Sequence, residues 1–377
     1  MAPLGIAAPA PVEAQSAGAA LYVSPAGNDV GPGSADAPWR TLSHALAALH
    51  AGDTLMVRGG TYRERVVGVT LQPGTAAQRI TVEAAPGERP VVAGLLELDA
   101  PDYWTVSGIN VTWDPATGKP DEHMVRILNG IGWVFENAEL SGARSFAAIL
   151  VGGTEKARPA TWAVRDNCIH DTVPTNGKNQ DQLVYVNSGL DAGAGVVERN
   201  ILFGAHNGAG VKLAGPSSNS GGAARVTVQY NTVYDTAQSV LVGGASFDNV
   251  VRRNILLGVG RAEGVVRAFQ LTGDGNVLSD NVAGGATRLQ FSDTAYRALQ
   301  DGGGNRFPVD PRFDSVTGCD GFHPRNAVAV AYGRHAAPAP AGRPAHRSSP
   351  PAVTWAAVAV GALAGLAVVL RLRRGRR

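Results

Sequence analysis

Residues 195–215, GVVERNILFGAHNGAGVKLAG, contain the pattern that decides the fold. Val197 stands three residues before Asn200, and a short apolar run follows the asparagine. Similar phrases are WVFENAEL (133–140), WAVRDNCI (162–169), VTVQYNTV (226–233), NVVRRNIL (249–256) and NVLSDNVA (276–283), after a looser first copy around Asn110. Their asparagines are Asn137, Asn167, Asn200, Asn231, Asn254 and Asn281, spaced 23 to 33 residues apart. A phrase that recurs at such a period indicates stacked structural repeats.

A second apolar phrase lies in each interval between asparagines. The copies are HMVRILNG, AAILVGG, QLVYVNSG, GVKLAG, SVLVGG and VVRAFQL. Apolar and β-branched residues alternate in them, which is the period of a strand and not of a helix. Units of this length share one continuous core only when they are stacked. The sequence therefore predicts an all-β fold, a right-handed parallel β-helix of about eight to ten coils. We expect its asparagines to take left-handed corner positions and to stack into a ladder.

The segments around the repeats predict how the solenoid begins and ends. Trp39 to Leu49 reads as a short amphipathic helix, with Thr41 as its N-cap, that covers the open first coil. The rhythm fades after Asn281, and residues 308–333 are expected to close the other end. The β-helix domain is thus placed at residues 21–333.

Outside this domain the sequence predicts export and a membrane anchor. Residues 1–20 resemble the remnant of an export signal and are left out of the fold. Residues 334–351 read as a Pro/Ala-rich linker. Residues 352–370 contain no charge and are long enough to span a membrane as one helix, and the basic tail 371–377 follows. We therefore expect a single-pass membrane protein with the β-helix outside the cell and the C-terminus in the cytoplasm.

Composition narrows the function. A net charge of +2 gives no general attraction to nucleic acid, and no nucleic-acid partner is expected. We find no Cys/His spacing for zinc, no phosphate-binding loop and no Gly-x-Ser-x-Gly. Cys168 and Cys319 are 151 residues apart. An exported domain could pair them, but no pattern supports it, which favours Cys168 as a small buried hydrophobe.

The N-terminal part resembles a known superfamily. Tyr22-Val23-Ser24-Pro25-Ala26-Gly27-Asn28-Asp29 and the strand from Gly52 to Glu64 are similar to the opening of pectate-lyase-like β-helix proteins, and Val309 to Phe313 resembles their closing phrase. The resemblance covers about residues 21–333. It implies the fold and leaves the activity open, because the superfamily includes lyases, epimerases, hydrolases and noncatalytic surface proteins.

A sharper resemblance concerns NGAGVKLAG, residues 207–215. It is similar to a segment of the ninth polysaccharide lyase family, in which a lysine removes the proton alpha to a uronate carboxylate beside a calcium ion held by aspartates. The resemblance implies Lys212 as the catalytic base and Asp181 as a Ca²⁺ ligand. The other aspartates of that site are missing from the sequence, and one carboxylate is too few for calcium.

The strand period adds an argument of its own for the same face. If Val211 and Leu213 point inward, Lys212 points outward. The same register turns Arg126, Leu150, Tyr185, Leu241 and Arg267 outward on neighbouring coils. We expect Arg126, Tyr185 and Arg267 to bind an acidic polysaccharide, with His206 as a further binding residue.

Two functions remain open at this point. One is a polysaccharide lyase that cleaves by β-elimination, and the other is a noncatalytic surface module that binds glycan or has a structural role. Ordinary solvated side chains would produce the same outward pattern. A shift of the register by one residue would reverse every face.

Overall fold

The computed structural model describes residues 20–336, except 120, 145, 155–156, 175–180, 216–220 and 259–263. All described residues belong to one compact unit, Met1–Ala337. The export segment, the membrane segment and the basic tail lie outside the described residues, apart from Ala20. Within the described residues, no helix has the length and apolarity needed to cross a membrane.

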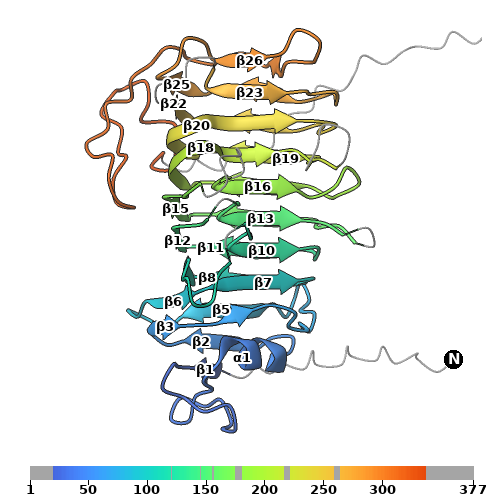
Figure 1. Ribbon diagram of the computed structural model, residues 1–377, viewed down its shortest axis with the longest axis vertical. Helices are drawn as coiled ribbons and strands as arrows, with labels where there is room; N and C mark the ends of the chain where they lie inside the picture. The colour runs from blue at the N-terminus through green and yellow to red at the C-terminus, as the bar shows by residue number, and fades with distance from the viewer. Residues whose placement is uncertain are drawn as a thin grey trace, which may run out of the picture. The chain divides into compact units, whose positions relative to one another are not determined.

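The described chain is a solenoid of parallel strands with three faces (Figure 1). The first face is an eleven-stranded sheet, so the stack is slightly longer than expected. Its strands are β1 (Ala20–Val23), β2 (Thr54–Val57), β5 (Ile80–Ala84), β8 (Trp104–Ser107), β11 (Val134–Glu136), β14 (Trp162–Arg165), β17 (Gly195–Glu198), β19 (Val226–Gln229), β21 (Val250–Arg252), β24 (Val277–Ser279) and β27 (Gln300–Asp301).

The second and third faces are joined through two long strands, β18 (Ile201–Leu213) and β20 (Thr232–Gly243), whose first parts belong to the second face and last parts to the third. The second face also contains β3 (Gly60–Tyr62), β6 (Pro90–Ala93), β9 (Asn110–Thr112), β12 (Glu139–Ser141), β15 (Cys168–His170), β22 (Ile255–Gly258) and β25 (Val282–Gly284). The third face also contains β4 (Arg65–Val66), β7 (Leu95–Asp99), β10 (Val125–Leu128), β13 (Ile149–Gly152), β16 (Val184–Asn187), β23 (Val266–Phe269) and β26 (Gln290–Ser292).

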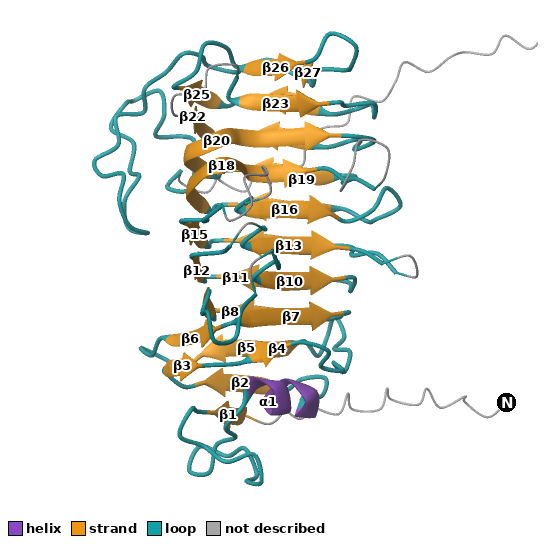
Figure 2. Cartoon of the chain, in the orientation of Figure 1, coloured by secondary structure: helices purple, strands orange, loops and turns teal. Residues whose placement is uncertain are grey.

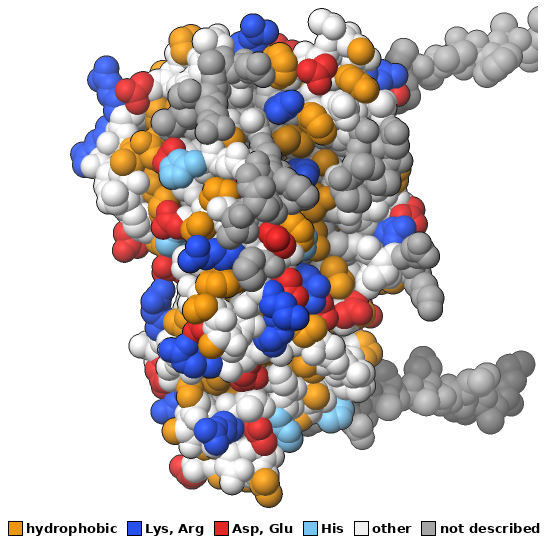
Figure 3. All heavy atoms as spheres, in the orientation of Figure 1, with side chains coloured by type: hydrophobic (Ala, Val, Ile, Leu, Met, Phe, Trp, Pro, Cys, Tyr) orange, Lys and Arg blue, Asp and Glu red, His pale blue; other side chains and the backbone are white. Residues whose placement is uncertain are grey.

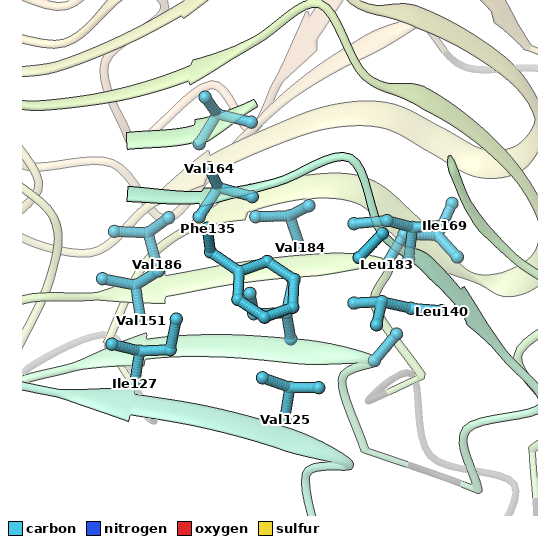
Figure 4. Close-up of a cluster of buried hydrophobic side chains, with 14 of the residues drawn as sticks. Val125, Ile127, Phe135, Leu140, Val151, Val164, Ile169, Leu183, Val184 and Val186 are labelled. Atoms are coloured by element: carbon cyan, nitrogen blue, oxygen red, sulfur yellow. The ribbon is translucent and has the colours of Figure 1, made fainter. Parts of the chain in front are cut away.

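Alternation along the strands builds the core. Phe135 of β11 points into the solenoid and lies among aliphatic side chains from all three faces (Figure 4). Val125, Leu140, Val164 and Val184 are among them, each fully or almost fully buried. Burying one such side chain stabilises the fold by about 1.5–3 kcal/mol. The core therefore runs through the stack without a break between coils.

A ladder of buried asparagines follows the corner between the first and second faces. The Nδ2 atom of Asn200 donates to Oδ1 of Asn231 at 2.9 Å, and Nδ2 of Asn231 donates to Oδ1 of Asn254 at 3.0 Å. The same bonds link the whole series Asn167, Asn200, Asn231, Asn254, Asn281 and Asn305. Each bond joins amides of successive coils, and the predicted ladder is therefore confirmed from Asn167 onward.

Two details of the predicted ladder were wrong. Val134 pairs with Ala163, so Asn137 stands opposite Asp166 and Ala138 takes the ladder position. The left-handed residue is the one before each ladder asparagine, for example Asp166 with φ +56° and Arg199 with φ +56°. The ladder amides instead bond across the corner, which requires no left-handed backbone.

The N-terminal end is capped by one helix, as predicted. Helix α1 (Leu42–Ala48) begins after Thr41, whose side chain accepts a hydrogen bond from the His44 amide. Leu42 and Leu46 join the same core as the coils. The helix lies beside β1 and β2, at the end of the solenoid (Figure 2).

The sequence predicted that the C-terminal segment closes the far end of the solenoid, and this prediction was wrong. Residues 311–336, which we call the strap, run back along the outside of the second face, beside β22, β25 and β15 (Figure 1). Phe322 is fully buried there with Cys168 and Ile201, and Tyr332 packs on Ile255 and Val282. Residues 334–336, assigned above to the linker, are part of the strap: the Arg334 guanidinium pairs with Asp166.

A disulfide between Cys168 and Cys319 fixes the strap to β15. The expectation of an unpaired Cys168 was wrong. The reason is the path of the strap, which brings the two Cα atoms to 5.6 Å across 151 residues of sequence. Local sequence patterns do not indicate such a path.

Candidate active site

The outward positions of the third face form one row along the stack. The row, from β7 to β26, consists of Glu97, Arg126, Leu150, Tyr185, Lys212, Leu241, Arg267 and Phe291. This is the register that the apolar alternation predicted, and it is confirmed. With about 4.8 Å between neighbouring strands, Arg267 lies about 10 Å and Arg126 about 14 Å from Lys212 along the row. Basic side chains lie among hydrophobic ones over this part of the molecule (Figure 3).

Lys212 lies half-buried in the middle of the row. Val211 and Leu213 are fully buried in the core on either side of it, which turns the lysine outward. Its Nζ atom lies 4.6 Å from the centre of the Tyr185 ring. Burial lowers the pKa of Lys212 below its usual value. In the described part of the chain no carboxylate pairs with it to offset that effect.

His123 belongs to this site, although the sequence had not singled it out. Its ring stacks on Phe146 at 4.9 Å and lies 5.8 Å from the ring of Tyr185. Burial, and then the charges of Arg126 and Lys212, lower the pKa of His123 to about 4, so the imidazole is neutral at pH 7. Nδ1 accepts a hydrogen bond from the Ala147 amide at 3.1 Å, so the proton resides on Nε2. His123 is therefore a neutral hydrogen-bond donor beside Lys212.

The two arginines of the row have different surroundings. The Arg126 guanidinium pairs with Glu97 of the neighbouring strand, so much of its charge is compensated. Arg267 lies over the Phe269 ring, with its Cζ 4.9 Å from the ring centre. Its Nε is buried and has no hydrogen-bond partner among the described residues. No carboxylate pairs with Arg267 among the described residues, so its charge, unlike that of Arg126, is left for an anionic ligand.

An apolar patch lies between Lys212 and Arg267. Leu241, only 6% exposed, packs there with Ala209, Ala214 and Phe269. Ala209 and Ala214 are buried as well, so the half-buried Phe269 is the member of the patch that the C–H groups of a sugar ring can contact.

Two predicted site residues do not belong to the row. His206 lies in the bend of β18, where its Nε2 is 2.7 Å from Oδ2 of Asp235, and its side chain is exposed. Asp181 is fully buried, and the Thr172 hydroxyl donates to its Oδ2 at 3.3 Å. Burial raises the pKa of Asp181. The remaining predicted residues, Arg126, Tyr185 and Arg267, share the row with Lys212.

The surroundings of Asp181 do not fit a calcium ion. Among the described residues, its buried Oδ1 atom has no hydrogen-bond partner, which provides one oxygen, whereas calcium takes six to eight. In the described residues, a single group of three metal-binding side chains lies close together, and it consists of Cys168, His170 and Cys319. That group is on the second face. We therefore derive no step of the chemistry through calcium.

The family comparison supports the superfamily that the sequence predicted, the pectate-lyase-like right-handed parallel β-helix proteins. Residues 21–197, just under half of the chain, match the family model described as Pel9A-like, right handed beta helix region. The match ends before Lys212 and thus bears on the fold rather than on that residue.

Two curated proteins are similar over shorter stretches. The uncharacterized protein YwoF of Bacillus subtilis (strain 168) is 39% identical over 80 residues, which cover 21% of this chain and 17% of that protein. Pectate lyase PEL9 of Emericella nidulans is 29% identical over 120 residues, covering 32% of this chain and 27% of the relative. The chain thus matches less than a third of the length of either relative.

Two solved structures are similar to this chain. Pectate lyase Pel9A superposes with a TM-score of 0.37 and 16% identity, covering 75% of this chain and 79% of that one. The complex of XylC with xylose gives a TM-score of 0.48 and 14% identity, covering 72% and 70%. Likeness at these values carries no argument about activity.

Proposed function

We propose that the third face binds an acidic polysaccharide and that Lys212 cleaves it by β-elimination. The observation that carries the proposal is the state of Lys212. It is a half-buried amine with a lowered pKa, and it lies over the ring of Tyr185. The same row contains Arg267, whose Nε has no hydrogen-bond partner among the described residues. A base must be neutral to take a proton, and lysine in water titrates near 10.4. Burial therefore prepares Lys212 for this role.

The proposed reaction uses the row as follows. Arg267 binds the uronate carboxylate and stabilises the negative charge that develops on it as the alpha proton leaves. Lys212 Nζ takes that proton, a carbon–carbon double bond forms, and the bond to the leaving glycosidic oxygen breaks. Water supplies the proton that the leaving oxygen acquires. His123 donates its Nε2 proton in a hydrogen bond to a substrate oxygen and does not act as the base.

A second candidate is a module that binds acidic glycan without cleaving it. The absence of a carboxylate cluster around Lys212 in the described residues favours it, because the resemblance to the ninth lyase family implies calcium at that place. Binding needs only Arg267, the apolar patch and Tyr185. The two candidates therefore share a surface and differ in turnover.

One assay separates them. The protein is incubated with pectins, alginates and glycosaminoglycans, with calcium or with a chelator, and the ultraviolet absorbance of unsaturated uronides is followed. We expect release from one of these polymers, unaffected by the chelator. Retention on the polymer in affinity electrophoresis without release supports the binding module. Neither release nor retention contradicts both candidates.

We further propose that the β-helix is displayed outside the cell on a C-terminal anchor. Only the sequence supports this part, through the uncharged segment 352–370 and the arginines that follow it. Protease added to intact cells should then remove the β-helix and leave the C-terminal tail protected. Digestion of the tail alone would show the opposite orientation.

A further inference from the structure

The second face carries a group of side chains that the proposed function does not use. Cys168 and His170 are two residues apart on β15, so both side chains point outward from the same strand. Cys319 of the strap lies over them. The two sulfur atoms and an imidazole nitrogen of His170 lie within 4.8 Å of one another.

Carboxylates hold the ring of His170 from both sides. Nδ1 lies 2.8 Å from Oδ2 of Asp171, and Nε2 lies 3.2 Å from Oε1 of Glu139. The ring also stacks on Phe203, at 4.8 Å and nearly parallel. A histidine whose Nδ1–H is held by a carboxylate is oriented as metal-binding histidines usually are. Its Nε2 then faces Glu139.

We propose that, once the disulfide is reduced, Cys168, Cys319 and His170 bind a zinc-class divalent cation. Two thiolates and one imidazole are a ligand set that zinc prefers. Glu139 is not one of this group, since its carboxylate contacts the His170 Nε2 and pairs with Arg89, so the fourth position is left to a water molecule. The metal and the disulfide are thus alternative ways to fix the strap to β15.

The change between the two states balances chemically. A dithiol reductant gives two electrons and two protons to the disulfide, yielding two protein thiols and the oxidised reductant. A divalent cation then replaces the two thiol protons, which are released to solvent. The two sulfurs move from bonding distance to the spacing of two ligands on one ion, and the side chains of an exposed strap can make so small a movement.

A cleft gives solvent access to the site. It has a volume of about 300 Å³ and is lined by Glu139, Cys168 and Cys319, together with Asp166 and Asp320. Arg334 also lines the cleft and pairs with Asp166, so the carboxylate charge of the cleft is partly compensated. The volume of the cleft still lets a hydrated ion reach the sulfurs without unfolding of the strap.

The test uses cobalt as a spectroscopic probe. The full chain is reduced with a dithiol under anaerobic conditions in the presence of Co²⁺, so that the metal can hold the strap from the start. We expect one cobalt per chain, a thiolate-to-cobalt charge-transfer band, and loss of that band when Zn²⁺ is added. The oxidised protein should show no band. A reduced protein without the band would overturn the proposal.

Variants assign the ligands. His170→Ala should weaken cobalt binding at least tenfold and shift the visible bands, and Cys319→Ser should remove most of the charge-transfer intensity. His50→Ala, which alters an exposed histidine at the other end of the molecule, is the matched control and should bind as the wild type does. Unchanged binding by His170→Ala would exclude the histidine and refute the assignment. Trypsin cleavage within the strap gives a second readout: Zn²⁺ should restore the protection that reduction removes.

Discussion

The second and third faces are built from the same coils, but their outward side chains differ in burial and in charge pairing. On the second face the strap covers the outward residues, and Phe322 is fully buried against Cys168 and Ile201. Charges there are paired, as in the contact of Arg334 with Asp166. On the third face Lys212 and Arg267 lie on aromatic rings and have no carboxylate partner among the described residues.

This difference separates structural surface from binding surface. A solenoid of this kind can pair its outward charges, as its second face does. Partly buried cations that stay unpaired cost stability and are retained where a ligand supplies the missing charge. The third face is therefore where we expect the polysaccharide, and the second face is where we expect effects on stability.

The largest effect is expected at Lys212. Lys212→Ala should lower uronide release by about 10³-fold, because it removes the base. The fold should stay intact, since an outward side chain contributes little to the core. The assay is turnover, with circular dichroism as the check on folding. Lys119→Ala, at an exposed lysine, is the matched control; equal losses in both variants would refute the assignment.

The opposite pattern is expected on the second face. Phe322→Ala removes a fully buried ring and should cost about 3–5 kcal/mol of the stability of the strap. Trypsin should then cleave the strap at Arg312 or Arg325 much faster, while turnover per folded molecule stays unchanged. Val328→Ala, at an exposed residue of the same segment, serves as the control. A large loss of turnover in Phe322→Ala would show that the two faces are coupled.

His123 should make the protein sensitive to acid. Its folded-state pKa of about 4 lies below the usual value of 6.5, so the unfolded chain binds the extra proton first as the pH falls. Stability is then complete above about pH 6.5 and declines toward pH 4, by about 2 kcal/mol after allowance for partial exposure. His123→Gln should flatten this decline in urea-unfolding curves. A slope unchanged by the substitution would place the acid sensitivity elsewhere.

The smallest expected effect distinguishes the two arginines. Arg267→Ala should raise KM for an acidic polymer about tenfold, because no carboxylate among the described residues pairs with Arg267. Arg126→Ala should change KM less, since Glu97 already pairs with Arg126. Measuring KM for both variants on one substrate decides the order. The reverse order would move the binding site toward the β7 end of the row.

The repeats were sufficient to predict the coils and the outward register of Lys212, and the amphipathic pattern of residues 39–49 predicted the capping helix. They failed where contacts are not periodic. Asn137 was aligned by its residue type, whereas pairing of the strands places it one residue off the ladder. The strap and its disulfide depend on a path across many coils, which no local pattern encodes.

Part of the candidate site could be predicted because the strand period is regular. Tyr185 and Lys212 stand at equivalent positions of successive strands, and the strand period finds such positions. His123 precedes its outward neighbour Arg126 by three residues and lies before the strand begins. Strand alternation does not determine the direction of a side chain at that position. A histidine at the start of the phrase HMVRILNG was the available signal.

The most direct test of the account is a titration of the lysines by NMR. The chain has only four lysines, at positions 119, 156, 178 and 212, so selective labelling and Lys212→Arg assign the Lys212 signal. We predict that this signal titrates below the usual value near 10.4 and shifts when an oligouronate is added, whereas the signal of the exposed Lys119 does not respond to the oligouronate. A Lys212 signal that titrates near 10.4 and does not shift when the oligouronate is added would contradict both the role of Lys212 as the base and the third face as the binding surface.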